Sequence, residues 1–205
     1  MKMDDQRCTI YLLRHGQTDH NRDGRLMGHL GVALAAHGRA QARRAAGFLA
    51  GQGIAAVYTS DLARAQATAE IVGGHLGLAV QPHPGLREID VGLLAGLTRD
   101  EIGEGYPEYV RAAERDPLNT RMPEGESFAE LTERAWAALA EIAAENAGRR
   151  VLAVTHGGVM RAAFAQALAV PWPAARAFGV ENCGVIKLNW SSSGPSLLVP
   201  GPLPA

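Results

Sequence analysis

The chain has 205 residues, of which 47% are hydrophobic and 20% charged, and its formal net charge at pH 7 is −1. This composition is typical of a folded domain and excludes a disordered chain. The small net charge argues against an overall attraction to nucleic acid or to an anionic membrane. No apolar run approaches the roughly 18 residues that a membrane-spanning helix needs, so no membrane partner is predicted.

The cysteine content points to a reducing compartment. Cys8 and Cys183 are too few for a disulfide framework and lack the CxxC spacing of a metal site. We interpret them as small core residues. The first residues contain no long apolar segment typical of a secretory signal. We therefore expect one domain over residues 1–205, located in the cytoplasm.

The first half of the chain alternates apolar runs with helical patterns. Residues 9–13 predict a buried strand, and the Ala-rich residues 37–51 predict a helix. Residues 55–60 predict a second strand, followed by a helix over 62–76 that Ser60 or Asp61 caps. Residues 78–84 predict a third extended segment.

The middle of the chain is irregular and charged, which predicts a lid or insertion over about 93–125. Short helices are expected within it, over 98–104 and 107–115. Ser127 and Glu130 have the spacing of a capping box, and a long amphipathic helix follows them. The last predicted elements are a strand over 149–155, a helix over 159–169, a strand over 183–190 and a loosely held tail over 191–205.

This alternation of strands and helices predicts an α/β fold, a three-layer sandwich around a mainly parallel sheet with a small helical insertion. In such sheets, ligands bind at the carboxyl ends of the strands. Arg14, His15 and Gly16 directly follow the first predicted strand, and His156 follows the fourth. Arg64 lies in the first turn of the helix after the second strand. We expect these strand ends to meet at one edge of the sheet.

Arg64 indicates the kind of ligand. A cation in the first turn of a helix opposes the helix dipole unless an anion lies at the same place. The helix after His156 would offer free N–H groups to such an anion, and the planar fork of arginine suits a tetrahedral oxyanion. These features predict a phosphate pocket. The alternatives are a solvated Arg64 and a His156 that only satisfies a core hydrogen bond.

Five segments, in chain order, resemble the histidine phosphatase superfamily, which includes the cofactor-dependent phosphoglycerate mutases. They are "LRHGQTDHN", "VYTSDLARAQATAE", "LREIDVGLLAGL", "PEGESFAEL" and "VLAVTHGGVMRA". The first alone is short, but five in the right order are specific and cover most of the chain. The resemblance implies a phosphoglycerate mutase-like fold, and it is compatible with a monomer or a homodimer.

The resemblance also implies residue roles. His15 would be the nucleophile and Glu88 the general acid and base, while Arg14, Arg64 and His156 would bind the transferring phosphoryl group. No metal and no other cofactor is implied. The rest of the substrate pocket would be formed by Gln17, Thr18, Asn21, Met27, Gly28 and Gly157.

A mechanism follows from these roles. Neutral His15 attacks phosphorus in line and forms a phosphohistidine, which divides one difficult step into two. Arg14, Arg64 and a protonated His156 would neutralise the phosphoryl charge. Glu88 would give a proton to the leaving alkoxide and later take one from water. Because a protonated His15 cannot attack, activity should be lost in acid.

Three functions fit this pattern. A metal-independent phosphomonoesterase acting on small phosphorylated metabolites is favoured, because the segment 93–122 is short and rich in acidic residues, whereas the mutases of this family tend to have a longer, basic insertion. A cofactor-dependent phosphoglycerate mutase is the alternative. A non-catalytic binder of phosphorylated ligands is disfavoured by the intact His15, Glu88 and His156. Lid side chains such as Tyr106, Tyr109 and Arg111 would select the substrate.

Overall fold

The residues that the structure describes, 7–191 and 194–198 of a computed structural model, surround a six-stranded sheet in the order β3-β2-β4-β1-β5-β6. Its strands are β1 (Cys8–Arg14), β2 (Ala56–Thr59), β3 (Val80–Pro82), β4 (Arg150–Thr155), β5 (Val185–Ser191) and β6 (Gly194–Leu198). Strands β3, β2, β4 and β1 are parallel, whereas β5 pairs antiparallel with β1 and β6 antiparallel with β5. The predicted α/β fold with a mainly parallel sheet is confirmed.

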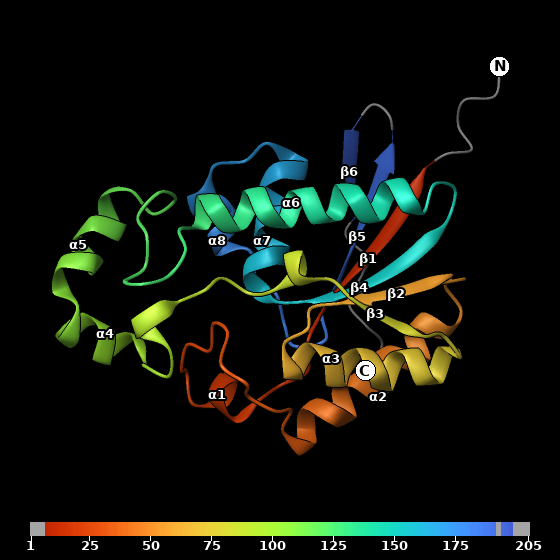
Figure 1. Cartoon of the computed structure of the whole chain (residues 1–205), viewed down its shortest axis with the longest axis horizontal. Coiled ribbons are helices and arrows are strands. Elements are labelled where there is room, and N and C mark those ends of the chain that lie inside the picture. Colours follow the sequence, from red (N-terminus) through yellow and green to blue (C-terminus); the bar gives the residue numbers. More distant parts are fainter. Residues whose placement is uncertain (1–6, 192–193, 199–205) are drawn as a thin grey trace.

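Helices cover both faces of this sheet (Figure 1). Helices α2 (Ala36–Ala50) and α3 (Ala63–Leu76) lie on one face, and α6 (Phe128–Glu145) and α7 (Gly157–Leu168) lie on the other. The shorter elements are α1 (Asp19–Arg22), η1 (Pro84–Leu86), η2 (Gly92–Leu94), α4 (Arg99–Gly105), α5 (Pro107–Arg115) and α8 (Trp172–Ala177). Among these, only α4 and α5 were predicted from the sequence.

The alternation of side chains along the central strands separates two cores. In β1, Ile10 and Leu12 are fully buried against the α6 and α7 side, whereas Tyr11 and Leu13 are buried against α2 and α3. Successive side chains of a strand point to opposite faces, and both faces here are covered, so the strand reads as a continuous apolar run. The strand ends are therefore held rigidly by packing on both sides.

One predicted helix cap is confirmed and one is wrong. At the start of α6, the backbone N–H of Glu130 donates to the Ser127 hydroxyl at 3.2 Å and the N–H of Ser127 donates to the Glu130 carboxylate at 2.8 Å. Helix α3 begins differently, because its N-cap is Leu62, which has no side-chain cap. The Ser60 hydroxyl accepts from the N–H of Leu62 at 3.2 Å, and Leu62 is the residue before the first residue of the helix.

The segment expected to be a lid carries both predicted helices, α4 and α5, which project beyond the sheet at the left of Figure 1. Its buried side chains Leu94, Ile102 and Met122 form a core with Val159 of α7. The tail departs from expectation, since Gly194–Leu198 form β6 instead of a loose segment. Residues 192–193 and 199–205 of that tail lie outside the described residues.

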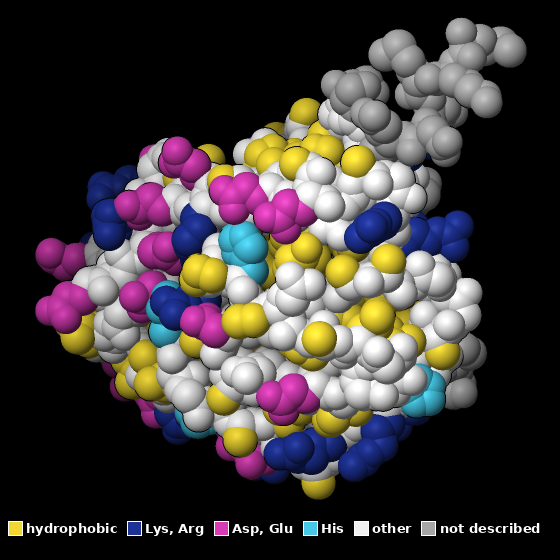
Figure 2. Space-filling view, turned by 45° about the vertical axis from the view of Figure 1, so that its right-hand side comes forward, with side chains coloured by type: hydrophobic (Ala, Val, Ile, Leu, Met, Phe, Trp, Pro, Cys, Tyr) yellow, Lys and Arg dark blue, Asp and Glu magenta, His cyan; other side chains and the backbone are white. Residues whose placement is uncertain are grey.

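The described surface is mixed in charge. On the face in Figure 2, acidic and basic side chains are interspersed. Arg121 forms an ion pair with Glu130, and Arg87 forms one with Asp61. Exposed pairs of this kind contribute little to stability. In the part of the chain covered by the structure, no helix is both long and apolar enough to cross a membrane.

Candidate active site

The strand ends meet as the sequence predicts. Strand β4 lies between β2 and β1, and the N–H of His15 donates to the carbonyl of Thr155 at 2.9 Å. The rings of His15 and His156, each directly after its strand, have centroids 5.1 Å apart. Arg64 lies in the first turn of α3, close behind β2. Three side chains from distant parts of the chain thus meet at this edge of the sheet.

Two glycines let the loop after β1 cross the start of α2 at close range. A Cβ atom on Gly16 would lie 2.4 Å from the carbonyl oxygen of Gly38, and one on Gly38 would lie 2.1 Å from the carbonyl oxygen of Gln17. Real Cβ atoms do not approach so closely, so neither position accepts a side chain without movement of the backbone. The crossing fixes the backbone next to His15.

His15 is oriented as a nucleophile. Its Nδ1 lies 2.8 Å from the carbonyl oxygen of Gly16. A carbonyl only accepts hydrogen bonds, so Nδ1 must carry the proton and the neutral ring keeps a free electron pair on Nε2. Burial, together with the nearby charges of Arg64 and Arg14, holds the pKa of His15 well below its ordinary value. The imidazole is therefore neutral over the physiological pH range.

Arg64 is fully buried and held by backbone carbonyls. Its Nη2 donates to the carbonyl of Gly28 at 2.7 Å and its Nη1 to that of Leu30 at 3.1 Å. Arg14 is held similarly, with Nη1 donating to the carbonyl of Val180 at 2.6 Å. Burial lowers the pKa of Arg64 to about 10, so it keeps its charge at pH 7. The hydrogen-bond partners of both cations are neutral carbonyls, and the Glu88 carboxylate is close enough to act on the charge of both.

Unpaired buried nitrogen atoms concentrate at this place. In the described residues, five buried side-chain polar atoms have no hydrogen-bond partner, and four of them belong to Arg14 (Nε), Arg64 (Nε) and His156 (Nδ1 and Nε2). Buried polar groups are normally paired. Orphaned nitrogens beside two buried guanidinium groups are what an oxyanion site provides.

The complete burial of His156 bears on its expected protonation. Burial, and then the charge of Arg64, hold the pKa of His156 well below its ordinary value, because a buried charge is poorly solvated. The protonated ring expected during phosphoryl transfer stays a prediction. A protonated His156 would require the charge of a bound phosphoryl group.

The other residues expected in the pocket surround the loop after β1. Thr18 caps α1, its hydroxyl lies 3.2 Å from the sulfur of buried Met27, and the Asn21 side chain accepts from the Thr18 N–H at 3.2 Å. Gly28 contributes its carbonyl to Arg64, as described above. The backbone of Gln17 contacts α2 through Gln41 and Ala35. This structure therefore places Gln17, Met27 and Gly28 mainly as supports of the pocket wall.

One of the N–H groups at the start of α7, which were expected to bind the anion, has another partner. The N–H of Gly158 donates to both carboxylate oxygens of Glu88, at 3.1 and 3.2 Å. A Cβ on Gly158 would lie 2.2 Å from Glu88 Oε1, so glycine is required for this approach. Gly157 lies beside Arg14, and a Cβ there would be 3.7 Å from Arg14 Nε.

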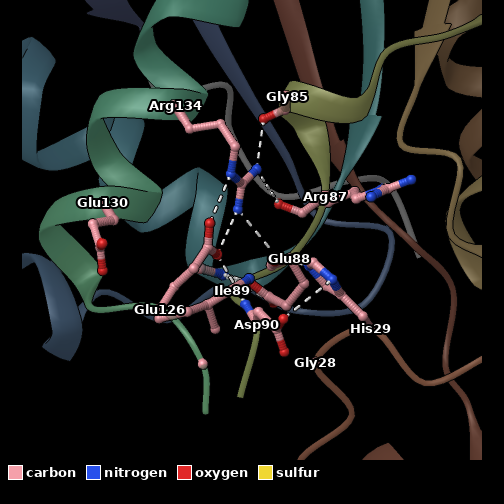
Figure 3. A network of polar contacts seen from close by, with 12 residues as sticks. Gly28, His29, Gly85, Arg87, Glu88, Ile89, Asp90, Glu126, Glu130 and Arg134 are labelled. Carbon is pink, nitrogen blue, oxygen red and sulfur yellow. Dashed lines mark hydrogen bonds and ion pairs between the residues drawn. The ribbon is translucent and has the colours of Figure 1, made fainter. Parts of the chain in front are cut away.

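The loop that carries Glu88 is held by a contact that the sequence analysis did not find (Figure 3). Arg134 of α6 uses all its guanidinium donors: it binds the Glu126 carboxylate through Nε (3.0 Å) and Nη2 (2.8 Å), and it donates to the backbone carbonyls of Gly85, Arg87 and Glu88. Glu126 in turn accepts from the N–H of Asp90 at 2.9 Å. We call Arg134 and Glu126 the loop clamp.

A cavity of about 810 Å³ adjoins the site, and Glu88 and Gly158 form part of its wall. Of the three lid side chains expected to select substrate, Tyr109 lines this cavity. Tyr106 packs in the core beneath the lid. Arg111 is exposed, forms an ion pair with Glu108 of the same helix, and does not line this cavity.

Comparison with known proteins decides the family. The model of the histidine phosphatase superfamily (branch 1) matches residues 10–201. The chain belongs to the histidine phosphatase superfamily. A curated relative named "Probable phosphoglycerate mutase GpmB", from Klebsiella pneumoniae, is 35% identical over 90% of this chain and 86% of its own length.

Solved structures that are similar to this chain agree with the family assignment. Bacillus stearothermophilus YhfR is 31% identical, with a TM-score of 0.89 over 96% of this chain and 98% of its own. A mycobacterial glucosyl-3-phosphoglycerate phosphatase, solved with VO3, is 34% identical, with a TM-score of 0.82 over 95% and 98% of the two chains. The resemblance stated from the sequence and the phosphoglycerate mutase-like fold are confirmed.

This member of the histidine phosphatase superfamily should be less stable in acid, because two of its histidines are buried and neutral. The unfolded chain binds a proton on each near pH 6.5, while the folded-state pKa values lie well below that. The free energy of unfolding should therefore fall as the pH drops below about 6.5, by up to about 1.4 kcal/mol per pH unit for each histidine, and level off below the folded-state values.

Urea unfolding between about pH 8 and pH 5 measures this slope. The variant His156→Gln should show a shallower dependence than the parent, whereas His37→Gln, which changes an exposed histidine, should not. Equal slopes in all three proteins would contradict the burial of a neutral His156.

Proposed function

We propose that this chain is a metal-independent phosphomonoesterase that hydrolyses small phosphorylated metabolites through a phosphohistidine on His15. One observation carries the proposal: a free Nε2 electron pair on His15 lies beside the orphaned buried nitrogens of Arg14, Arg64 and His156. A nucleophile next to an oxyanion site favours phosphoryl transfer. The solved relative named as a phosphatase supports the same reading.

In the first half of the proposed reaction, Nε2 of His15 attacks phosphorus and the bond from phosphorus to the leaving oxygen breaks. Arg14 and Arg64 hold the phosphoryl oxygens. His156 takes the proton of a substrate that enters as the monoanion, and the phosphate released at the end of the cycle takes this proton back. Protonated Glu88 gives its proton to the leaving oxygen, so the alcohol departs neutral.

In the second half, Glu88 takes a proton from water and the resulting hydroxide attacks phosphorus. The bond between phosphorus and Nε2 breaks, which releases phosphate and returns neutral His15. Charge neutralisation in this scheme comes from side chains alone. Among the described residues there is no group of three or more His, Cys, Asp or Glu that could hold a metal ion, and metal independence stays a prediction.

A phosphoglycerate mutase is the second candidate, because curated relatives carry that name. A mutase must keep water from the phosphohistidine and return the phosphoryl group to a bound acid. The lid segment, residues 93–122, is short and rich in acidic residues, whereas the resemblance associates the mutases with a longer, basic insertion. We therefore favour hydrolysis. The cytoplasmic location and the monomeric or homodimeric state also stay predictions.

The test is an assay of several phosphate esters with a metal chelator present, scored for free phosphate and for isomerised product. Release of free phosphate from more than one ester supports the phosphatase. Exclusive isomerisation of phosphoglycerate would establish the mutase instead, and binding without turnover would establish a non-catalytic binder. Loss of all activity on chelation would overturn the metal-independent mechanism.

The loop clamp predicts a positioning role for Arg134. Arg134→Lys keeps the charge but cannot form the planar fork, so Glu88 should lose its alignment and kcat should fall by about 10- to 100-fold, with KM changed only a few-fold. The control is Arg121→Lys, which also weakens an arginine–glutamate pair, but one between exposed side chains.

A double mutant separates positioning from general destabilisation. If Arg134 acts only through Glu88, then Arg134→Lys should have little further effect on kcat when Glu88→Gln is already present. If the loss of kcat in the double variant instead equals the two single-variant losses multiplied together, the positioning role is contradicted.

A further inference from the structure

The cavity beside Glu88 indicates where the leaving group of the ester binds, if the proposed function holds. Glu88 lies between the phosphoryl pocket and this cavity and would protonate the leaving oxygen, so the rest of the alcohol must extend into the cavity. Its volume of about 810 Å³ lies near the upper end of the range for small-molecule sites. The cavity is open to solvent on one side, and its walls come from the Glu88 loop, the lid helices α4 and α5, α7 and α8.

The walls of this cavity are mainly apolar. They include Leu94, Ile102, Tyr109, Met122, Phe128 and Trp172, and the rings of Phe128 and Trp172 pack 4.5 Å apart. A small polyol such as glycerol would lose the hydration of its hydroxyl groups here without gaining partners for them, which is unfavourable. An apolar or aromatic body would gain from the same burial.

Positive charge is unbalanced around the same cavity. Arg99 of α4, Arg161 of α7 and Arg176 of α8 all line it. Within the described chain, none of the three is in an ion pair; Arg161 donates from Nε to the carbonyl of Phe178 at 3.1 Å. Glu114 is the one carboxylate in the lining besides Glu88. A second negative group on the ligand would complement this charge.

We propose that the preferred substrates are phosphate monoesters whose leaving alcohol has a large apolar or aromatic body and a second negative charge. This inference rests on the proposed function and specifies its substrate class. The body fills the cavity between the lid and α8, and the charged group reaches the arginines at its rim.

Three primary alkyl phosphates test this proposal: glycerol 3-phosphate, 2-(naphthyl)ethyl phosphate, and a 2-(naphthyl)ethyl phosphate that carries a carboxylate on its distal ring. All three have the same kind of leaving oxygen, so differences in rate report on binding of the rest of the alcohol. We expect kcat/KM to be at least ten-fold higher for the naphthyl ester than for glycerol 3-phosphate, and several-fold higher again for the carboxylate. Equal or greater efficiency with glycerol 3-phosphate would overturn the proposal. Release of phosphate from none of the esters would instead overturn the phosphatase itself.

A matched pair of variants in α8 locates the preference. Ala177 lines the cavity and Ala174 does not, and both are exposed. Ala177→Phe should lower kcat/KM for the naphthyl esters about ten-fold and leave glycerol 3-phosphate within two-fold, while Ala174→Phe should change neither. An equal loss for all esters in Ala177→Phe would overturn the assignment.

A charge variant tests the second part of the proposal. Arg176→Gln should remove the advantage of the carboxylated ester and leave the uncharged naphthyl ester unchanged. If both Arg176→Gln and Arg99→Gln still hydrolyse the carboxylated ester better than the uncharged naphthyl ester, to the same degree as the parent, the proposed role of these arginines is overturned.

Discussion

Replacing His15 by alanine is expected to lower kcat/KM for phosphate esters by roughly 10⁴-fold or more, because the proposed reaction has no other group to accept the phosphoryl group. His15 presents an unprotonated Nε2 to the pocket, since its Nδ1 proton is committed to the Gly16 carbonyl. His156, the other histidine in the pocket, has both ring nitrogens buried and unpartnered, and we assign it to binding.

The same substitution should abolish covalent labelling. Brief incubation with a ³²P-labelled ester, followed by denaturation in alkali, should leave label on the parent chain and none on His15→Ala. His37→Ala, which removes an exposed histidine of α2, should label like the parent. An undiminished turnover rate in His15→Ala would exclude phosphohistidine chemistry, provided that its circular dichroism matches that of the parent.

The electrostatics of the pocket favour the binding of an anion. Arg14 and Arg64 are held in place by hydrogen bonds to neutral backbone carbonyls, so their charges are oriented. Fixed charges in a poorly solvated site need little reorganisation when a dianion arrives. Burial also keeps His15 and His156 neutral before that arrival, which leaves the nucleophile available and gives His156 the capacity to take a proton.

The sequence could predict this half of the site because its geometry follows from local rules. Parallel strands bring their carboxyl ends to one edge, so Arg14, His15 and His156 had to converge once their strands were found. Arg64 stood out because it opposes the dipole of its own helix. Buried strands with continuous apolar runs were also recognised within a residue or two of their observed ends.

The other half depends on tertiary contacts that leave no local pattern. Arg134 reads in the sequence as one charge on the polar face of a helix, and only the fold brings it to the Glu88 loop. Asn182 donates to the carbonyl of His15 at 3.0 Å from a loop with no distinguishing signal. The neutral state of His156 requires knowledge of its complete burial. Strand β6 was missed because glycine, proline and serine disfavour strands in isolation.

Replacing Glu88 by glutamine is the second large effect, and it should depend on the ester. For alkyl phosphates, whose leaving alkoxide needs a proton, kcat should fall by about 10²- to 10⁴-fold. For an ester with an acidic phenol, such as p-nitrophenyl phosphate, the bond breaks without that proton, so formation of the phosphohistidine should be much less affected. The amide retains the shape of the carboxyl group and can still accept from the N–H of Gly158, so the fold should be preserved.

A rapid-quench experiment separates the two halves of the reaction. With p-nitrophenyl phosphate, Glu88→Gln should give a burst of nitrophenol equal to the enzyme concentration and then turn over slowly, because the second half still needs a base to deprotonate water. Asp90→Gln is the control, since Asp90 lies on the same loop but its side chain accepts from the N–H of Gly92 and pairs with His29 at 3.8 Å. An equal loss in the rate of phosphohistidine formation for alkyl and nitrophenyl esters would show that Glu88 does not protonate the leaving group. Proton donation is the one role whose importance in this first step must vanish as the leaving group becomes acidic.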